Sequence, residues 1–200
     1  MKFVYFGYDF MLGMVDRLIA DGHELAGIFS FQCDNVFNFN SQSKELAEEL
    51  DIPFSIGKPL PMDIKVFTDQ GTQVFLAAGY PHKIPHIDED YAYGLNLHPS
   101  LLPQGRGLMP TPTIIINSPD ICGFTIHKLT QIFDDGDILI QKPINLTDQD
   151  DVETLSARIA MAAPEAISKV FKNLPSMWQN AWPQDKNKAS TFPVPDDQMR

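Results

Sequence analysis

The stretch KFVYFGYDFMLGMVDRLIADGHELAGIF, residues 2–29, decides which fold this chain can adopt. It opens with an apolar run at 2–6, which predicts a buried strand that ends at Gly7. After Asp9, the expected helix N-cap, apolar residues recur with helical spacing, at Leu12, Val15, Leu18 and Ile19. A second strand is expected at 25–29. Strand, helix and strand in this order form a βαβ unit, so we expect an α/β chain with a parallel sheet and a right-handed crossover.

The remainder of the chain continues this alternation within one domain. The patterns predict a short helix at 41–50 and further strands at 52–55, 73–78, 123–129 and 138–141. The last helix is expected to start at Asp150, which forms a capping-box pattern with Glu153. We place the folded domain at residues 1–175. Residues 176–200 are expected to form a polar tail or linker, with no C-terminal domain.

Composition excludes several classes of function. Apolar residues make up 44% of the chain and charged residues 20%, which is typical of a globular protein. The net charge of −11, with only 15 Lys and Arg, argues against a partner nucleic acid, because phosphate binding needs dense positive charge. Cys33 and Cys122 are too few for a disulfide framework and lack the spacing of a metal site. No signal peptide or membrane span is apparent, so we expect a cytoplasmic location and no membrane partner.

The most specific chemical signal is the stretch NLHPSLLP, residues 96–103, followed by DDGD at 134–137. If residues 94–98 form a strand, Asn96 and His98 point to the same face and Leu97 points to the core. An amide, an imidazole and a carboxylate that converge in this way suit acyl transfer, since one group can stabilise an oxyanion while the others move a proton. His127 follows Thr125 by two residues on a predicted strand, and either supports this site or has a structural role.

Other motifs carry weaker signals. Gly7, Tyr8 and Asp9 follow the first strand, where a dinucleotide fold binds phosphate, but the Gly-x-Gly-x-x-Gly pattern is absent. This segment is therefore a simple turn or a turn that contacts a substrate. The run at 134–137 lacks the alternating ligands of a calcium loop, and we expect no metal.

Taken together, these residues resemble the family of formyltransferases that use 10-formyltetrahydrofolate. The resemblance covers residues 1 to about 175. Its motifs are FGYDF at 6–10, AAGY at 77–80, NLHPSLLP at 96–103, RG at 106–107, GFTIH at 123–127 and FDDGDI at 133–138. The resemblance implies a Rossmann-like, mostly parallel sheet with helices on both faces.

The resemblance also implies a set of site residues. It makes Asn96, His98 and Asp134 the catalytic trio. It places the folate pteridine between segments 78–84 and 134–137, so that the cofactor-binding residues are Tyr80, Pro81, His82, Lys83, Ile84, Asp135, Gly136 and Asp137. We expect substrate contacts from the turn Gly7, Tyr8 and Asp9 and from Arg106.

The expected acceptor is a small-molecule amine, namely an amino group on a nucleotide-linked sugar. The loop at 31–43 has no Lys or Arg, whereas tRNA-acting members of this family carry a long basic loop there. The opening segment also resembles that of enzymes that formylate a UDP-linked amino sugar. Two alternatives stay open: a hydrolase that releases formate from formyltetrahydrofolate, and a non-catalytic module that binds folate or nucleotide.

Overall fold

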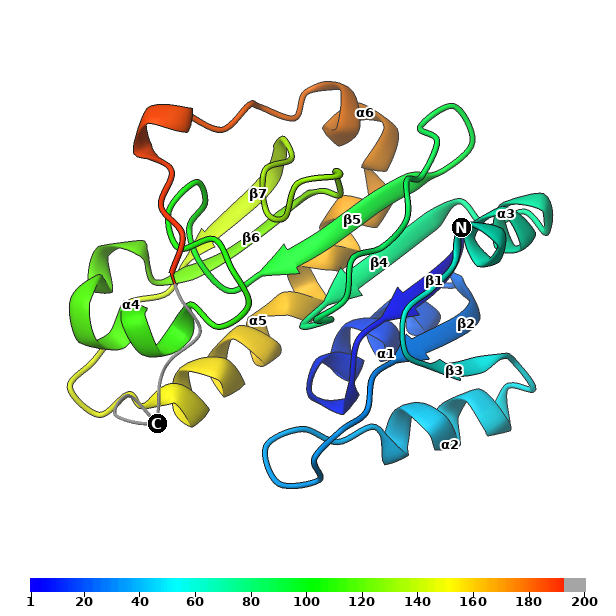
Figure 1. The fold of residues 1–200 in the computed structure, drawn as a ribbon, viewed down its shortest axis with the longest axis horizontal. Helices are drawn as coiled ribbons and strands as arrows, with labels where there is room; N and C mark the ends of the chain where they lie inside the picture. Colours follow the sequence, from blue (N-terminus) through cyan, green and yellow to red (C-terminus); the bar gives the residue numbers. More distant parts are fainter. Residues whose placement is uncertain (193–200) are drawn as a thin grey trace. The chain divides into compact units, whose positions relative to one another are not determined.

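The computed structural model describes residues 1–192, and the chain folds as two compact units, Met1–Leu95 and Asn96–Arg200 (Figure 1). The strand order is β3-β2-β1-β4-β5-β6-β7, and β5 (Tyr93–His98) runs through the boundary between the units. The expected division into one domain at 1–175 and a tail or linker at 176–200 stays a prediction. Within the described residues, no helix is long and apolar enough to cross a membrane.

The N-terminal unit holds the predicted βαβ opening. Its elements are β1 (Lys2–Phe6), the 3₁₀ helix η1 (Asp9–Met11), α1 (Leu12–Ala20), β2 (Glu24–Ser30), α2 (Ser41–Glu49), β3 (Phe54–Ile56), α3 (Pro61–Asp69) and β4 (Val74–Ala78). β1 pairs in parallel with β2 and β4, and β2 pairs in parallel with β3. The core of this unit includes the β1 residues 3–6, which are fully buried because a parallel strand is covered on both faces.

The C-terminal unit continues from β5 with an antiparallel hairpin. Its elements are α4 (Thr111–Asn117), η2 (Pro119–Ile121), β6 (Gly123–Lys128), β7 (Ile138–Pro143), α5 (Val152–Lys172), α6 (Leu174–Gln179) and η3 (Lys186–Lys188). β6 and β7 pair antiparallel, and α5 packs against both (Figure 1). The sheet is therefore mostly parallel, as the resemblance implied.

Two helix starts differ from the expectation, and the first is that of α5. Its N-cap is Asp151, whose carboxylate accepts from the Thr154 N–H at 2.8 Å. Asp150, the expected cap, instead pairs with Arg158 at 2.6 Å. The error arises because two consecutive aspartates offer the same capping chemistry, and the register of the first turn selects between them. The second is the start of α1, which is described below with Asp9.

The segment that follows α5 contacts the rest of the C-terminal unit, including residues that were expected to belong to a tail or linker. It includes α6, and Trp182 forms a β-bridge with Ile138 of β7. Trp178 is buried, and the Lys128 ammonium lies 4.6 Å from the centre of its ring. Of the expected tail at 176–200, residues 193–200 lie outside the described residues.

Candidate active site

β5 delivers two polar side chains to one carboxylate. Leu97 is 1% exposed and anchors the strand in the core, whereas Asn96 is half-buried. The Asn96 Nδ2 and the His98 Nδ1 each lie 3.4 Å from Oδ1 of Asp134. The alternation predicted for residues 94–98 is therefore confirmed, and these three residues come together as the sequence implied.

Asp134 lies in the loop between β6 and β7 with a backbone φ of 55°, in the left-handed region that is rare for non-glycine residues. Its second carboxylate oxygen, Oδ2, accepts a hydrogen bond from the Gly107 N–H at 2.9 Å. A conformation of this kind costs of order 1–3 kcal/mol and persists only where the surroundings impose it. The fold therefore holds this residue in a strained conformation that aims its carboxylate at Asn96 and His98.

His127, on β6, lies next to Asn96 and Asp134 and completes the cluster. The sequence left open whether this histidine supports the site or has a structural role. Its Nδ1 lies 2.8 Å from the carbonyl oxygen of Lys128, so Nδ1 carries the hydrogen that this oxygen accepts. In the neutral ring, Nε2 is then an acceptor, and it takes a hydrogen bond from the Asn96 amide at 3.0 Å. Nε2 also lies 3.6 Å from Asp134 Oδ1. His127 therefore orients Asn96, and its period-two spacing from Thr125 was the sequence signal for it.

The pKa values of His98 and Asp134 are both displaced. His98 Nε2 lies 2.7 Å from the Gly105 carbonyl oxygen and donates to it, which leaves Nδ1 facing Asp134. Burial lowers the pKa of His98 below 6.5, and this outweighs the raising effect of the Asp134 carboxylate. Burial would raise the pKa of Asp134, but the His127 and His98 rings and the Gly107 N–H together lower it to about 2. At neutral pH we therefore assign an ionised carboxylate next to a neutral imidazole, a pair that can accept one proton.

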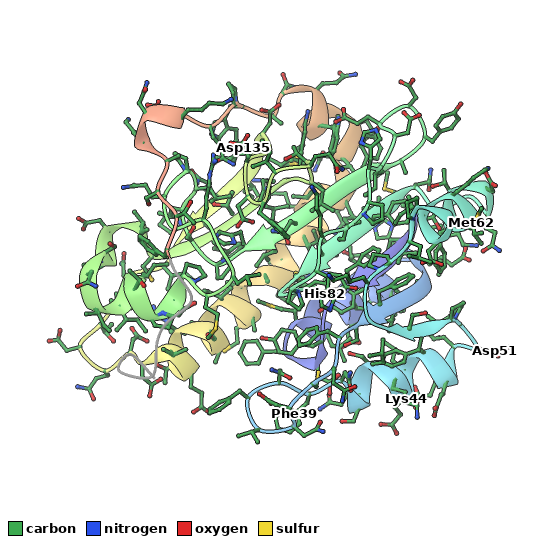
Figure 2. All side chains as sticks on the ribbon, in the orientation of Figure 1. Phe39, Lys44, Asp51, Met62, His82 and Asp135 are labelled. Atoms are coloured by element: carbon green, nitrogen blue, oxygen red, sulfur yellow. The ribbon has the colours of Figure 1, made fainter. Side chains whose placement is uncertain are left out.

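Arg106 and Asp135 lie in the same unit but are engaged with each other. The guanidinium Nη1 lies 2.7 Å from Asp135 Oδ1, and Nη2 donates to Gln184 Oε1 at 2.6 Å. Figure 2 labels Asp135 on the loop between β6 and β7. The expected contacts of Arg106 with substrate and of Asp135 with folate stay predictions. Gln184 was missed, because it falls in the stretch that was expected to be a tail.

The other two expected folate contacts in this loop have clear backbone roles. A Cβ on Gly136 would lie 1.9 Å from the carbonyl oxygen of Lys128, so only glycine allows this approach. The Asp137 carbonyl accepts from the Lys128 N–H at 2.9 Å. These contacts shape the turn that carries Asp134.

In the N-terminal unit, Asp9 makes contacts that were not expected, and its expected contact with substrate stays a prediction. It is not the N-cap of α1, which begins at Leu12. Its carboxylate accepts instead from the N–H groups of Gln42 at 3.0 Å and Ser43 at 2.8 Å and from the Ser43 hydroxyl at 2.7 Å, at the start of α2. The N-cap expectation was wrong because the chain folds back over 34 residues to present a second helix N-terminus.

Gly7 and Tyr8 lie where the ends of β1 and β4 meet in this unit. A Cβ on Gly7 would come within 2.7 Å of the Ala78 carbonyl oxygen, and one on Gly79 would come within 2.6 Å of the Tyr8 ring. The Tyr8 ring also stacks on Phe10, with centroids 6.2 Å apart. The glycines thus permit a close junction in which Tyr8 is held by packing.

The segment expected to bind the folate follows β4. Tyr80 is buried, and its hydroxyl donates to the Gly57 carbonyl. The ring of His82, labelled in Figure 2, lies edge-on to Tyr80 at 5.4 Å. Pro81 is half-buried, Lys83 is exposed and Ile84 is buried. Folate binding by residues 80–84 stays a prediction. Among the described residues, no group of three or more His, Cys, Asp or Glu side chains is arranged to hold a metal ion.

The chain is similar to several methionyl-tRNA formyltransferases. It is 37% identical over 86 residues, 42% of the chain, to that of Ehrlichia canis (strain Jake). It is 28% identical over 206 residues to that of Coprothermobacter proteolyticus, a match that covers 98% of the chain and 67% of that protein. The chain spans only 28–44% of the length of its relatives from Ehrlichia.

Solved structures share the fold. A sugar N-formyltransferase from Shewanella sp FDAARGOS_354 matches with a TM-score of 0.72 at 19% identity, over 96% of this chain and 76% of that chain. Glycinamide ribonucleotide transformylase 1 from Symbiobacterium toebii matches with a TM-score of 0.70 at 19% identity, over 88% of each chain. The sugar 3N-formyl transferase WlaRD, solved in the presence of dTDP and 5-N-formyl-THF, matches with a TM-score of 0.69 at 15% identity, over 96% of this chain and 69% of that chain.

The family model for formyl transferase matches residues 65–171, more than half of the chain. The matched range contains β5, the loop with Asp134 and the strand with His127, so it includes the whole polar cluster described above. The chain therefore belongs to the formyl transferase family.

Proposed function

We propose that this protein is an N-formyltransferase that moves the formyl group of 10-formyltetrahydrofolate to a primary amine. The observation that carries this proposal is the position of Asn96 Nδ2 and His98 Nδ1, each of which lies 3.4 Å from Asp134 Oδ1. The cluster of Asn96, His98, His127 and Asp134 contains a hydrogen-bond donor and a proton acceptor but no Ser, Thr, Cys or Lys side chain. It therefore suits a reaction in which the substrate amine attacks directly, without acylation of the protein.

The reaction begins when the amine lone pair attacks the formyl carbon, which leaves a negative charge on the formyl oxygen. Asn96 donates to this oxygen with the Nδ2 hydrogen that otherwise makes the long contact to Asp134, while His127 holds the other Nδ2 hydrogen at 3.0 Å. The amine must then lose a proton, and the pair formed by His98 Nδ1 and Asp134 Oδ1 accepts it. Collapse of the intermediate breaks the bond between the formyl carbon and N10 of the folate. N10 takes up the proton that the His98–Asp134 pair accepted from the amine, which returns the pair to its starting state.

The hydrogen bond from His98 Nε2 to the Gly105 carbonyl decides where the His98–Asp134 pair accepts a proton. Because Nε2 donates to Gly105, an added proton can go only to Nδ1, directly opposite the carboxylate. The ion pair that results is stabilised inside a site where both side chains are nearly buried. Proton transfer of this kind contributes about 10²–10⁴-fold to a rate.

For the acceptor we propose an amino group on a nucleotide-linked sugar. The acidic chain and the absence of Lys and Arg from residues 31–43 support a small acceptor over a polyanion. Two of the proteins with this fold are named as sugar formyltransferases. A second candidate acceptor is methionyl-tRNA, which the names of the sequence relatives favour.

A competition assay separates these possibilities. The protein is mixed with 10-formyltetrahydrofolate, methionyl-tRNA and a panel of UDP- and dTDP-linked amino sugars, and each product is quantified at two salt concentrations. Turnover of one sugar without formyl-tRNA supports the proposal. Formylation of the tRNA alone, with a steep loss at higher salt, overturns the sugar assignment. Formate release that needs no amine identifies a hydrolase, and absence of any folate turnover refutes the formyltransferase assignment.

A further inference from the structure

Gln184 is a buried side chain that forms hydrogen bonds with the loops of the polar cluster. It is 8% exposed. Its Nε2 donates at 2.8 Å to the backbone carbonyl of Asp134 and at 2.8 Å to that of Gly136. Its Oε1 accepts from Arg106 Nη2 at 2.6 Å, so the amide uses both of its hydrogens and its oxygen.

The segment that carries Gln184 is itself held in place on both sides. Before Gln184, Trp182 exchanges two backbone hydrogen bonds with Ile138 of β7, at 2.8 and 3.0 Å. After it, backbone bonds join Arg106 to Ser190 and Phe192, each at 2.9 Å. The Gln184 amide thus reaches the turn that contains Asp134 from a segment that backbone hydrogen bonds hold on both sides.

We propose that Gln184 is a positioning residue for formyl transfer, which fixes the turn of Asp134 and thereby aims its carboxylate at His98 and Asn96. This inference rests on the proposed function for its catalytic consequence. The backbone of Asp134 has a φ of 55°, a conformation that the residue does not favour. Two hydrogen bonds from one amide to the carbonyls of residues 134 and 136 hold the turn on both sides of Asp135.

The same amide also links the turn to Arg106. Arg106 Nη1 pairs with Asp135 at 2.7 Å, and the neighbouring Gly107 N–H donates to Asp134 Oδ2 at 2.9 Å. Gln184, Arg106 and Asp135 therefore close a ring of contacts around the turn. Removal of the amide donors would let the carboxylate move, and an error of about 1 Å in the position of a catalytic group can cost about 10²-fold in rate.

Two substitutions distinguish the role of the Gln184 amide donors from that of its acceptor oxygen. Gln184→Met removes all of its hydrogen bonds at similar length. Gln184→Glu keeps an acceptor for Arg106 but cannot donate to the two carbonyls. Gln179, an exposed glutamine at the end of α6, provides matched controls as Gln179→Met and Gln179→Glu. Each variant is assayed for kcat and KM with 10-formyltetrahydrofolate and the acceptor found above, and for thermal unfolding.

We expect both Gln184 variants to lose about 10–10²-fold in kcat with little change in KM, because they disturb a group that acts in the transition state. The Gln179 variants should match the parent. Parental kcat in Gln184→Glu would show that the two carbonyl contacts are dispensable and would overturn the proposal. A loss that the Gln179 variants share would overturn it as well.

A second readout does not depend on turnover. The ring-proton NMR signals of His98 and His127, assigned with single histidine variants, are titrated in the parent and in Gln184→Met. Because the Asp134 carboxylate raises the pKa of His98, its displacement should lower that pKa further. An unchanged His98 titration would overturn the positioning role, even if the protein formylates no acceptor. Failure of this inference is thereby distinguished from failure of the proposed function.

Discussion

Asp9 and Asp134 are two aspartates that follow strands of the sheet, and they differ in what surrounds their carboxylates. Asp9 in the N-terminal unit receives two backbone N–H groups and a hydroxyl at the start of α2. Asp134 in the C-terminal unit receives one backbone N–H on Oδ2, while Oδ1 faces an amide and two imidazoles. The first carboxylate has fixed donors, and the second has partners that can gain or lose protons.

This difference shows how a structural carboxylate can be told from a chemical one. Backbone N–H donors keep their hydrogens at any ordinary pH, so the contacts of Asp9 at the start of α2 offer no route for proton transfer. The imidazole Nδ1 of His98 has a free electron pair at neutral pH, so a proton can enter between it and Asp134. The type of partner therefore matters more than burial or proximity to a strand end.

The largest expected effect is that of Asp134→Asn. The amide cannot accept a proton and cannot stabilise a protonated His98, so we expect kcat to fall by about 10²–10⁴-fold. Folate binding, measured by fluorescence quenching, should stay close to parental. Full activity in this variant would mean that Asp135 or Asp137 is the proton acceptor.

The next effect in size is that of Asn96→Ala, because it removes the donor to the developing oxyanion. Loss of one such donor costs about 10²–10³-fold in kcat. The exposed Asn117 at the end of α4 provides the control, as Asn117→Ala should leave kcat unchanged. Near-parental turnover of Asn96→Ala with its amine would remove this residue from the mechanism.

A smaller and gradual effect on kcat/KM is expected when the pH is lowered. His98 must be neutral to accept a proton, and burial lowers its pKa, so the acid limb of kcat/KM should lie below pH 6.5. On that limb the rate should fall by about tenfold per pH unit. A rate that instead falls as the pH rises through this range would show that His98 works as an acid. The exposed His86 is the control, since His86→Gln should not move the limb.

The smallest effect on the reaction is expected from Asp9→Ala, which tests the other side of the comparison. Loss of the contacts at the start of α2 should lower the free energy of unfolding by about 1–2 kcal/mol, as measured in urea. Glu45→Ala, an exposed change in the same helix, should have a much smaller effect on stability. A large rise in the KM of the acceptor, with stability unchanged, would support the expected contact of Asp9 with substrate.

The sequence by itself determined the features that depend on short-range patterns. The apolar run at 2–6 and the apolar helical stripe that follows predicted the βαβ opening. Apolar residues must recur at a fixed spacing along the chain if a helix is to bury one of its faces. Alternation along β5 put Asn96 and His98 on one side and Leu97 in the core. The helices α3 and α4 were not predicted, since each is short and has a weak apolar pattern.

Only the tertiary structure decided which distant groups meet. Asp9 caps a helix that starts over 30 residues later, and Gln184 reaches the carbonyl of Asp134 across 50 residues. Local propensity is blind to such pairs, because the loops between them and the packing of the chain decide which donor meets which acceptor. The residue types of the candidate site could therefore be predicted from the sequence, whereas the contacts that aim Asp134 depend on the tertiary structure.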